Sequence, residues 1–257
     1  MAYKLISCDV FFREMCQVVS GARDRVDMHF LPKGLHDLPS TDMRARLQAA
    51  VDDVDESDYE AVLLGYGLCN NGLHGVQARG IPLVLPRAHD CITLFFGSRQ
   101  RYLDYFWKHP GVYFKTSGWI ERGEAQGDLK QLSIEHLQGM DMTYEEMEEK
   151  YGEDNARYLY ETLVESVRHT YRQFTFIEMG VEPDDRFERE TERLADEKGW
   201  AYEKVRGNLS LFERLVNGEW NDEDFLVVRP GHRIVARYDD GIVSESPDAS
   251  GSISSSG

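Results

Sequence analysis

The chain has 257 residues, of which 41% are hydrophobic, 29% charged and 11% aromatic, a composition typical of globular proteins rather than collagen-like or disordered chains. Asp and Glu outnumber Lys and Arg by 46 to 29, and the net charge of −17 argues against nucleic-acid binding. No apolar run is long enough to span a bilayer, and the first residues lack the long apolar core of a signal peptide. We therefore expect a cytoplasmic protein that binds neither nucleic acid nor membranes.

The first third of the chain alternates between short apolar runs and segments with helical spacing. Such alternation is typical of parallel strands covered by helices. The expected strands are Tyr3–Val10, Val26–Leu31, Tyr59–Leu64 and Ile81–Leu85. The expected helices are Phe11–Ser20, a helix that begins at Thr41, Gly72–Arg79 and, despite Gly97, Cys91–Trp107.

The second half repeats this alternation after a polar bridge at 121–127. A loop with a short strand is expected at Pro110–Ile120, an acidic helix at the capping-box pair Thr143 and Glu146, and a longer helix from Asp154 or Asn155 through Phe174. Further strands are expected at Thr175–Met179, Ala201–Val205 and Phe225–Val228, and helices at Asp184–Gly199 and Leu209–Val216.

The whole pattern predicts an α/β fold of two similar Rossmann-like lobes, with mostly parallel sheets flanked by helices. The predicted N-terminal lobe covers residues 1–125 and carries the candidate site, and the C-terminal lobe covers 126–243. Residues 244–257 are rich in Ser, Gly, Asp and Pro and predict a disordered tail.

Cysteine and histidine residues follow three of the predicted strands. Cys8 closes the first strand, Cys69 lies in the loop after 59–64, and His89 and Cys91 follow 81–85. Ligands of open parallel sheets bind beyond the carboxyl ends of the strands, so these side chains are expected at one edge. Thiolates and imidazole are ligands of zinc and other thiophilic metals, whose catalytic sites keep one open position. The alternative is that the cysteines are small buried core residues.

Two further residues are candidates for a catalytic role at the same edge. His36 follows the second strand in Pro-Lys-Gly-Leu-His-Asp and is a candidate acid or base, although a turn histidine without a role fits the sequence too. Arg87 could hold an anionic group of a substrate, or it could pair with Asp90 as part of the scaffold.

Several other residues are candidates for ligand binding. Gly65 and Gly67 flank Tyr66 in a partial phosphate-loop signal that a tight buried turn would explain equally well. The loop after the third strand, the segment that follows Gly97 and the end of the last strand supply the other candidates: Asn70, Ser98, Arg99, Arg101 and His232.

Long segments of the chain resemble the domain of unknown function 1638 family. The resemblance rests on Lys4–Cys8, Phe30–Asp37, Gly65–Gly72, Pro86–Tyr102, Pro110–Ile120 and Asp222–Ile234. The family has no settled function. The resemblance nevertheless implies a genomic setting similar to that of proteins that accompany corrinoid-dependent methyl transfer. The pair His89-x-Cys91 also looks like the ligand pair of zinc-dependent corrinoid methyltransferases.

The first functional hypothesis is therefore a metal-thiolate enzyme of one-carbon or corrinoid-linked methyl-transfer metabolism. Zinc or another thiophilic metal would be its cofactor, a corrinoid is a second candidate cofactor, and a small molecule and a corrinoid protein are the candidate partners. The alternative is a non-catalytic protein that binds a corrinoid, a metal or a small anionic ligand.

Overall fold

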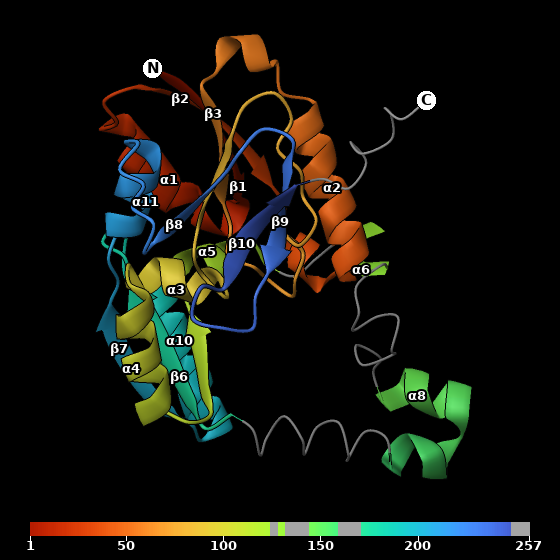
Figure 1. The fold of residues 1–257 in the computed structure, drawn as a ribbon. Helices are drawn as coiled ribbons and strands as arrows, with labels where there is room; N and C mark the ends of the chain where they lie inside the picture. Colours follow the sequence, from red (N-terminus) through yellow and green to blue (C-terminus); the bar gives the residue numbers. More distant parts are fainter. Residues whose placement is uncertain (124–127, 132–143, 159–170, 248–257) are drawn as a thin grey trace.

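A computed structural model describes residues 1–123, 128–131, 144–158 and 171–247 (Figure 1). Within these ranges the chain forms a mixed α/β fold with two sheets and a hairpin. The larger sheet has the strand order β2 (Arg25–Leu31), β1 (Ala2–Cys8), β3 (Ala61–Gly65), β4 (Leu83–Pro86) and β8 (Phe225–Val228). The first four strands run parallel, and β8 runs antiparallel to β4.

The apolar runs explain why the central strands form. Every residue of β3 and β4 is buried, as expected for parallel strands that are covered on both faces. Helices α1 (Phe12–Ser20) and α11 (Ser210–Val216) pack together on one face, and α2 (Ser40–Asp52) lies on the opposite face (Figure 1). The predicted α/β fold with mostly parallel sheets flanked by helices is confirmed.

The direction of the chain reverses at the centre of this sheet. Helix α1 connects β1 to β2 on one side, whereas α2 connects β2 to β3 on the other side of β1. The carboxyl ends of β1 and β3 therefore flank a topological switch point, where loops diverge to opposite faces and leave a crevice.

The second sheet is smaller and wholly parallel. Its strands are β5 (Val112–Lys115), β6 (Gln173–Glu178) and β7 (Ala201–Arg206), and α10 (Arg186–Lys198) packs on β6 and β7. Strands β9 (His232–Ala236) and β10 (Val243–Pro247) form an antiparallel hairpin. The remaining elements are η1 (Asp9–Phe11), η2 (Lys33–Asp37), η3 (Glu56–Asp58), α3 (Cys91–Phe96), α4 (Arg99–Lys108), α5 (Ser117–Glu121), α6 (Asp128–Gln131) and α8 (Tyr144–Tyr151).

Two predicted helices differ in the structure. Residues 72–79 form turns and a short bridge instead of a helix. The predicted helix Cys91–Trp107 is two helices, because Gly97 adopts the left-handed conformation (φ +70°) that ends α3. Ser98 then begins α4 by accepting a hydrogen bond from the backbone of Arg101.

The middle of the chain can be compared only in part. Thr143 lies outside the described residues, although α8 begins directly after it. Residues 153–158 are helical as expected, and 159–170 lie outside the described ranges. The predicted helix cannot extend to Phe174, because Phe174 is paired in β6.

Each sheet takes strands from both of the predicted lobes. Strand β5 precedes the predicted division at residue 125 but pairs with β6, and β8 follows that division but pairs with β4. The division into 1–125 and 126–243 stays a prediction. The predicted tail starts too early, because Ser244 to Pro247 are paired with β9, and residues 248–257 lie outside the described chain.

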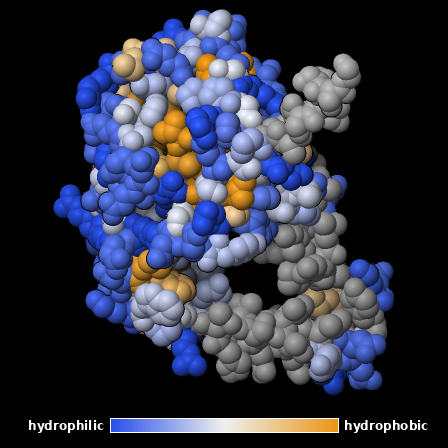
Figure 2. All heavy atoms as spheres, in the orientation of Figure 1, coloured by the Kyte–Doolittle hydropathy of each residue, from blue (hydrophilic) through white to orange (hydrophobic). Residues whose placement is uncertain are grey.

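The surface is mostly polar on the face shown in Figure 2, where hydrophobic residues form small separate patches among hydrophilic ones. Among the described helices, none combines the length and the hydropathy that a membrane span requires.

Replacing Gly97 by alanine is expected to destabilise the fold more than the same change at Gly199. Both residues end a helix with positive φ (+70° and +66°), so alanine costs about 1 kcal/mol of backbone strain at either site. At Gly97 the new Cβ would also lie 2.7 Å from the Cβ of Asn208, whereas nothing lies within 4 Å at Gly199. Urea unfolding should show a loss at Gly97→Ala that is larger by at least about 1 kcal/mol. Equal losses would mean that the loop at Asn208 gives way without cost.

Candidate functional site

A pocket with a volume of about 330 Å³ lies at the carboxyl edge of the parallel strands of the larger sheet. We call it the thiol pocket. Its thiol side is formed by Cys8, Cys69 and Cys91, and its other polar residues include Lys33, His36, Tyr66, Asn70 and Asp90. Its aromatic side is formed by Phe11, Tyr113, Phe114, Trp119 and Tyr171. The pocket therefore joins the larger sheet to β5 and α5.

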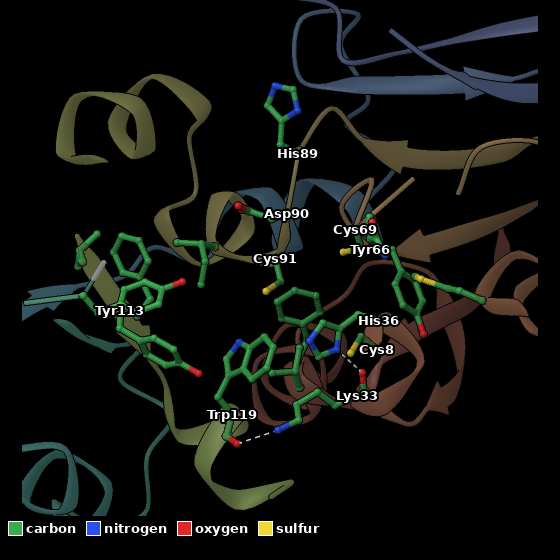
Figure 3. A pocket seen from close by; sticks show the side chains of 18 residues that line it. Cys8, Lys33, His36, Tyr66, Cys69, His89, Asp90, Cys91, Tyr113 and Trp119 are labelled. Atoms are coloured by element: carbon green, nitrogen blue, oxygen red, sulfur yellow. Dashed lines mark hydrogen bonds between the residues drawn. The ribbon is translucent and has the colours of Figure 1, made fainter. Parts of the chain in front are cut away.

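Three separate segments bring the thiols to this pocket. Cys8 is the last residue of β1, Cys69 lies in the loop after β3, and Cys91 is the first residue of α3 after β4. Figure 3 shows their sulfur atoms directed into the pocket. The predicted convergence of these cysteines at one sheet edge agrees with this geometry.

Burial keeps the three thiols protonated at neutral pH. Removal from water raises the pKa of Cys69 to about 12, and it also raises the pKa of Cys8 and of Cys91. The charge of a neighbouring thiolate raises the pKa of Cys8 and of Cys91 further, and the charge of Asp90 does so at Cys69. Lys33 opposes the shift at Cys8, and the indole of Trp119 opposes it at Cys91, but both effects are smaller than that of burial.

His89 is among the residues that line the pocket, but its side chain does not join the thiols. Its side chain is exposed and turns away from the pocket, while its backbone carbonyl accepts a hydrogen bond from the Cys69 amide at 3.0 Å. The chain enters α3 immediately after His89, with Asp90 as the N-cap, so the side chains of His89 and Cys91 diverge. His89 thus connects two loops of the site through its backbone.

His36 lines the pocket as a doubly hydrogen-bonded ring. Its Nδ1 lies 2.6 Å from the carbonyl oxygen of Lys33, and its Nε2 lies 2.9 Å from a carboxylate oxygen of Asp37. Burial alone would lower the pKa of His36, but the hydrogen bond and charge of Asp37 outweigh it and raise the pKa above its ordinary value. Because both partners accept, the ring is a double donor, which makes it a cation and leaves no nitrogen for a metal.

Lys33 contributes a second positive charge. Its ammonium group lies 4.7 Å from the centre of the Trp119 ring and donates to the backbone carbonyls of Trp119 and Gly123 (Figure 3). No motif in the sequence marks Lys33, Tyr66 or Trp119. Their positions shortly after β2, β3 and β5 are the signal that could have found them, because loops after parallel strands form such sites.

The backbone around Cys69 is unusual. Cys69, Asn70 and Asn71 are consecutive residues with φ of 41°, 53° and 60°, a conformation that residues other than glycine rarely adopt. The amides of Leu68 and Cys69 donate to the carbonyls of Ala88 and His89. This strained turn holds Cys69 against the loop that carries Cys91, and strain of this kind concentrates at functional sites.

The predicted glycines serve close packing. A Cβ at Gly65 would lie 2.3 Å from the Ser7 hydroxyl oxygen, and one at Gly67 would lie 2.7 Å from the backbone of Asp90. Neither glycine lines the pocket, so the tight buried turn explains them better than a phosphate loop. Asn70 does line the pocket.

Arg87 does not reach the thiol pocket. Its guanidinium donates to the backbone carbonyls of Asp222, Phe225, Gly241 and Val243, which joins β4 to the last strands of the chain. These carbonyls occupy its donors, so the predicted catalytic role gives way to a structural one. The predicted pairing with Asp90 is not seen either, because Asp90 caps α3 and accepts from Tyr102.

The other candidate ligand-binding residues also lie outside the pocket lining. Arg99 pairs with Asp240, and Arg101 donates to the carbonyls of Phe96 and Arg206. Ser98 caps α4, and His232 lies on β9 with its Nδ1 near the carbonyl of Pro230. The structure therefore brings together Cys8, His36, Cys69, Asn70 and Cys91 of the predicted site.

A metal ion could bind to the three thiols only if their side chains changed position. Among the residues that the structure describes, no three His, Cys, Asp or Glu side chains lie close enough together to hold a metal ion as they stand. The thiols would have to turn toward one another, which for cysteine requires rotation about a single side-chain torsion.

One protein-family model matches the sequence. A family model described as "Protein of unknown function (DUF1638)" matches residues 30–216, which include Cys69, Cys91 and most of the pocket lining. No curated protein and no solved structure matches the chain.

Replacing Asp37 by asparagine is expected to lower the pKa of His36 below about 6.5, because burial then acts on the ring without the opposing carboxylate. In the parent protein the raised pKa contributes stability that is complete below the unfolded value and is lost as the pH rises through the folded value. Histidine NMR titration measures the shift. Asp55→Asn, which changes the carboxylate that caps η3, should leave His36 unchanged. An unaltered pKa of His36 in Asp37→Asn would show that the pair is not formed in solution.

Proposed function

Because the chain belongs to the DUF1638 family, whose description names no function, we propose from the thiol pocket itself that the protein is a metal-thiolate enzyme. In this proposal Cys8, Cys69 and Cys91 bind zinc or another thiophilic metal, and the rest of the pocket holds a small substrate. The observation that carries the proposal is that three segments distant in the sequence bring Cys8, Cys69 and Cys91 to one cavity at a topological switch point. The remaining cysteine, Cys16, does not line this cavity.

The donor set favours a soft metal. Sulfur ligands select zinc, copper(I) or iron–sulfur centres over magnesium and calcium. Asp90 and His36 are committed to other partners and His89 faces away, so sulfur supplies all three protein ligands in this proposal. Three protein ligands are the number found in catalytic zinc sites, where the fourth position stays open for water or substrate.

The reaction class that we propose is methyl transfer in one-carbon metabolism. Zinc held by Cys8, Cys69 and Cys91 would supply a Lewis acid that lowers the pKa of a substrate thiol. That thiol would lose its proton and take the methyl group from a methylated corrinoid, whose cobalt would keep the electron pair of the broken cobalt–carbon bond. The cavity of about 330 Å³ is at the small end of the range for ligand sites, so a whole corrinoid would stay outside it. The corrinoid is therefore proposed as the group of a partner protein.

The alternative function is non-catalytic binding of a small ligand. It is favoured by the largely apolar and aromatic lining and by thiols that remain protonated without a metal. Turnover distinguishes the two functions, because an enzyme loaded with metal should transfer a methyl group to a thiol, whereas a binding protein should only retain its ligand.

Single replacements of the three pocket cysteines by serine are each expected to weaken zinc binding at least about tenfold, because serine is a poor ligand for soft metals. His89→Ala is the matched control and should bind zinc like the parent, since its side chain is exposed and turned away. Affinity is measured by competition with a chromogenic chelator in protein without an affinity tag. Parent-like binding by all three serine variants would end the metal proposal.

Zinc binding at pH 7 is expected to release about three protons per ion, because each ligand thiol must lose its proton. The raised pKa values of Cys8, Cys69 and Cys91 mean that these protons are present before binding. Calorimetry in buffers of different ionisation enthalpy counts them. Removal of Cys16, the fourth cysteine, should not change the number, and a release near zero would exclude coordination by these thiols.

A further inference from the structure

Two hydrogen-bond donors in the wall of the thiol pocket have no acceptor. The hydroxyl of Tyr66 and the indole Nε1–H of Trp119 are buried and find no hydrogen-bond partner within the described part of the chain. The indole N–H is directed toward the Cys91 sulfur closely enough to favour its thiolate, yet the contact does not complete a hydrogen bond. Both residues line the cavity, so a bound molecule could reach them.

Unpaired buried donors restrict the chemistry of a ligand. Each donor has lost its hydrogen bonds to bulk water, and an acceptor atom on the ligand would restore one. An ammonium compound offers only further donors, so it would leave both groups unpaired. Sites built around such donors reject ligands that lack the matching acceptor.

The charges around Trp119 favour a negative acceptor. The Lys33 ammonium lies 4.7 Å from the indole ring centre on one side, and the His36 ring meets the same indole edge-on at 5.0 Å. Three carboxylates lie nearby and each already has a partner: Asp37 pairs with His36, Asp9 accepts from the Lys33 amide, and Asp90 accepts from Thr93. The Trp119 donor and the two cations therefore lie together at one end of the pocket, whereas Tyr66 lies on the side of Cys69 (Figure 3).

The walls of the pocket favour an apolar, aromatic part in the same ligand. Rings of Phe11, Tyr113, Phe114 and Tyr171 line the cavity, whose volume of about 330 Å³ suits a molecule with a single ring. We infer that the thiol pocket binds a small aromatic carboxylate, with its carboxylate accepting from Trp119 Nε1–H and its ring against these aromatic side chains. The inference rests on the proposed use of this pocket as the ligand site, but it needs no metal.

Calorimetric titration of metal-free protein with benzoate and benzylamine tests this inference. The two probes share a ring of one size, but only benzoate carries an acceptor and a negative charge at pH 7. Benzoate is expected to bind at least about tenfold more tightly than the benzylammonium ion, the gain expected from a charge-assisted hydrogen bond. Trp119→Phe should remove at least about nine tenths of the benzoate affinity and leave benzylammonium within about twofold.

Two further variants complete the experiment. Trp107→Phe is the matched control, because Trp107 on α4 is 78% exposed and lies outside the pocket lining, and it should bind both probes like the parent. Tyr66→Phe tests the second donor and replaces Trp119→Phe if that variant does not fold. Equal binding of the two probes, no binding of benzoate, or full benzoate affinity in Trp119→Phe would overturn the inference. Zinc binding is measured separately, so its failure would leave this result intact.

Discussion

The parallel pairing of β1, β3 and β4 is the constraint on which the candidate site depends. Ser7 lies opposite Gly65, and Leu63 lies opposite Val84, so the three strands end at nearly the same level. Residues that follow these strands must then meet at one edge. A register shift of one residue would turn the side chain of Cys8 to the opposite face of the sheet.

The pocket combines neutral thiols with charged side chains that already have hydrogen-bond partners. Burial favours the uncharged thiols, whereas Lys33 and His36 are held by backbone carbonyls and by Asp37. In the proposed complex the two cations would contribute a field at the aromatic end that their present partners already fix in place. Such a preorganised arrangement favours recognition of charge in a low-dielectric site.

Much of the site could be predicted because the ends of the central strands can be recognised in the sequence. The buried run before Gly65 marks a central strand, which is enough to place Cys69 at the carboxyl edge. The direction of the His89 side chain could not be predicted, because it depends on the exact residue at which α3 begins. Arg87 was also beyond prediction, since its carbonyl partners come from segments more than 130 residues later.

Other differences between the predictions and the structure have local causes. The aromatic pattern of Cys91–Trp107 continues across Gly97 and conceals the break, which only the packing of Asn208 against that glycine reveals. Trp119 and Tyr66 carry no motif, because what marks them is that their buried donors find no partner among the residues that the structure describes. A sequence can show where a donor is, but not whether the folded chain supplies its acceptor.

The antiparallel strand β8 has a consequence for the order of events in folding. It supplies the outer neighbour of β4, from which it is separated by more than 130 residues, and Phe225 lies opposite Pro86. Pairings across such sequence separations form slowly, because closing the long loop costs entropy before any contact is gained. During synthesis, the edge of β4 that pairs with β8 therefore remains open until residues 225–228 have been synthesised. Until then the nascent chain exposes an unpaired edge of an apolar strand, a feature that favours aggregation.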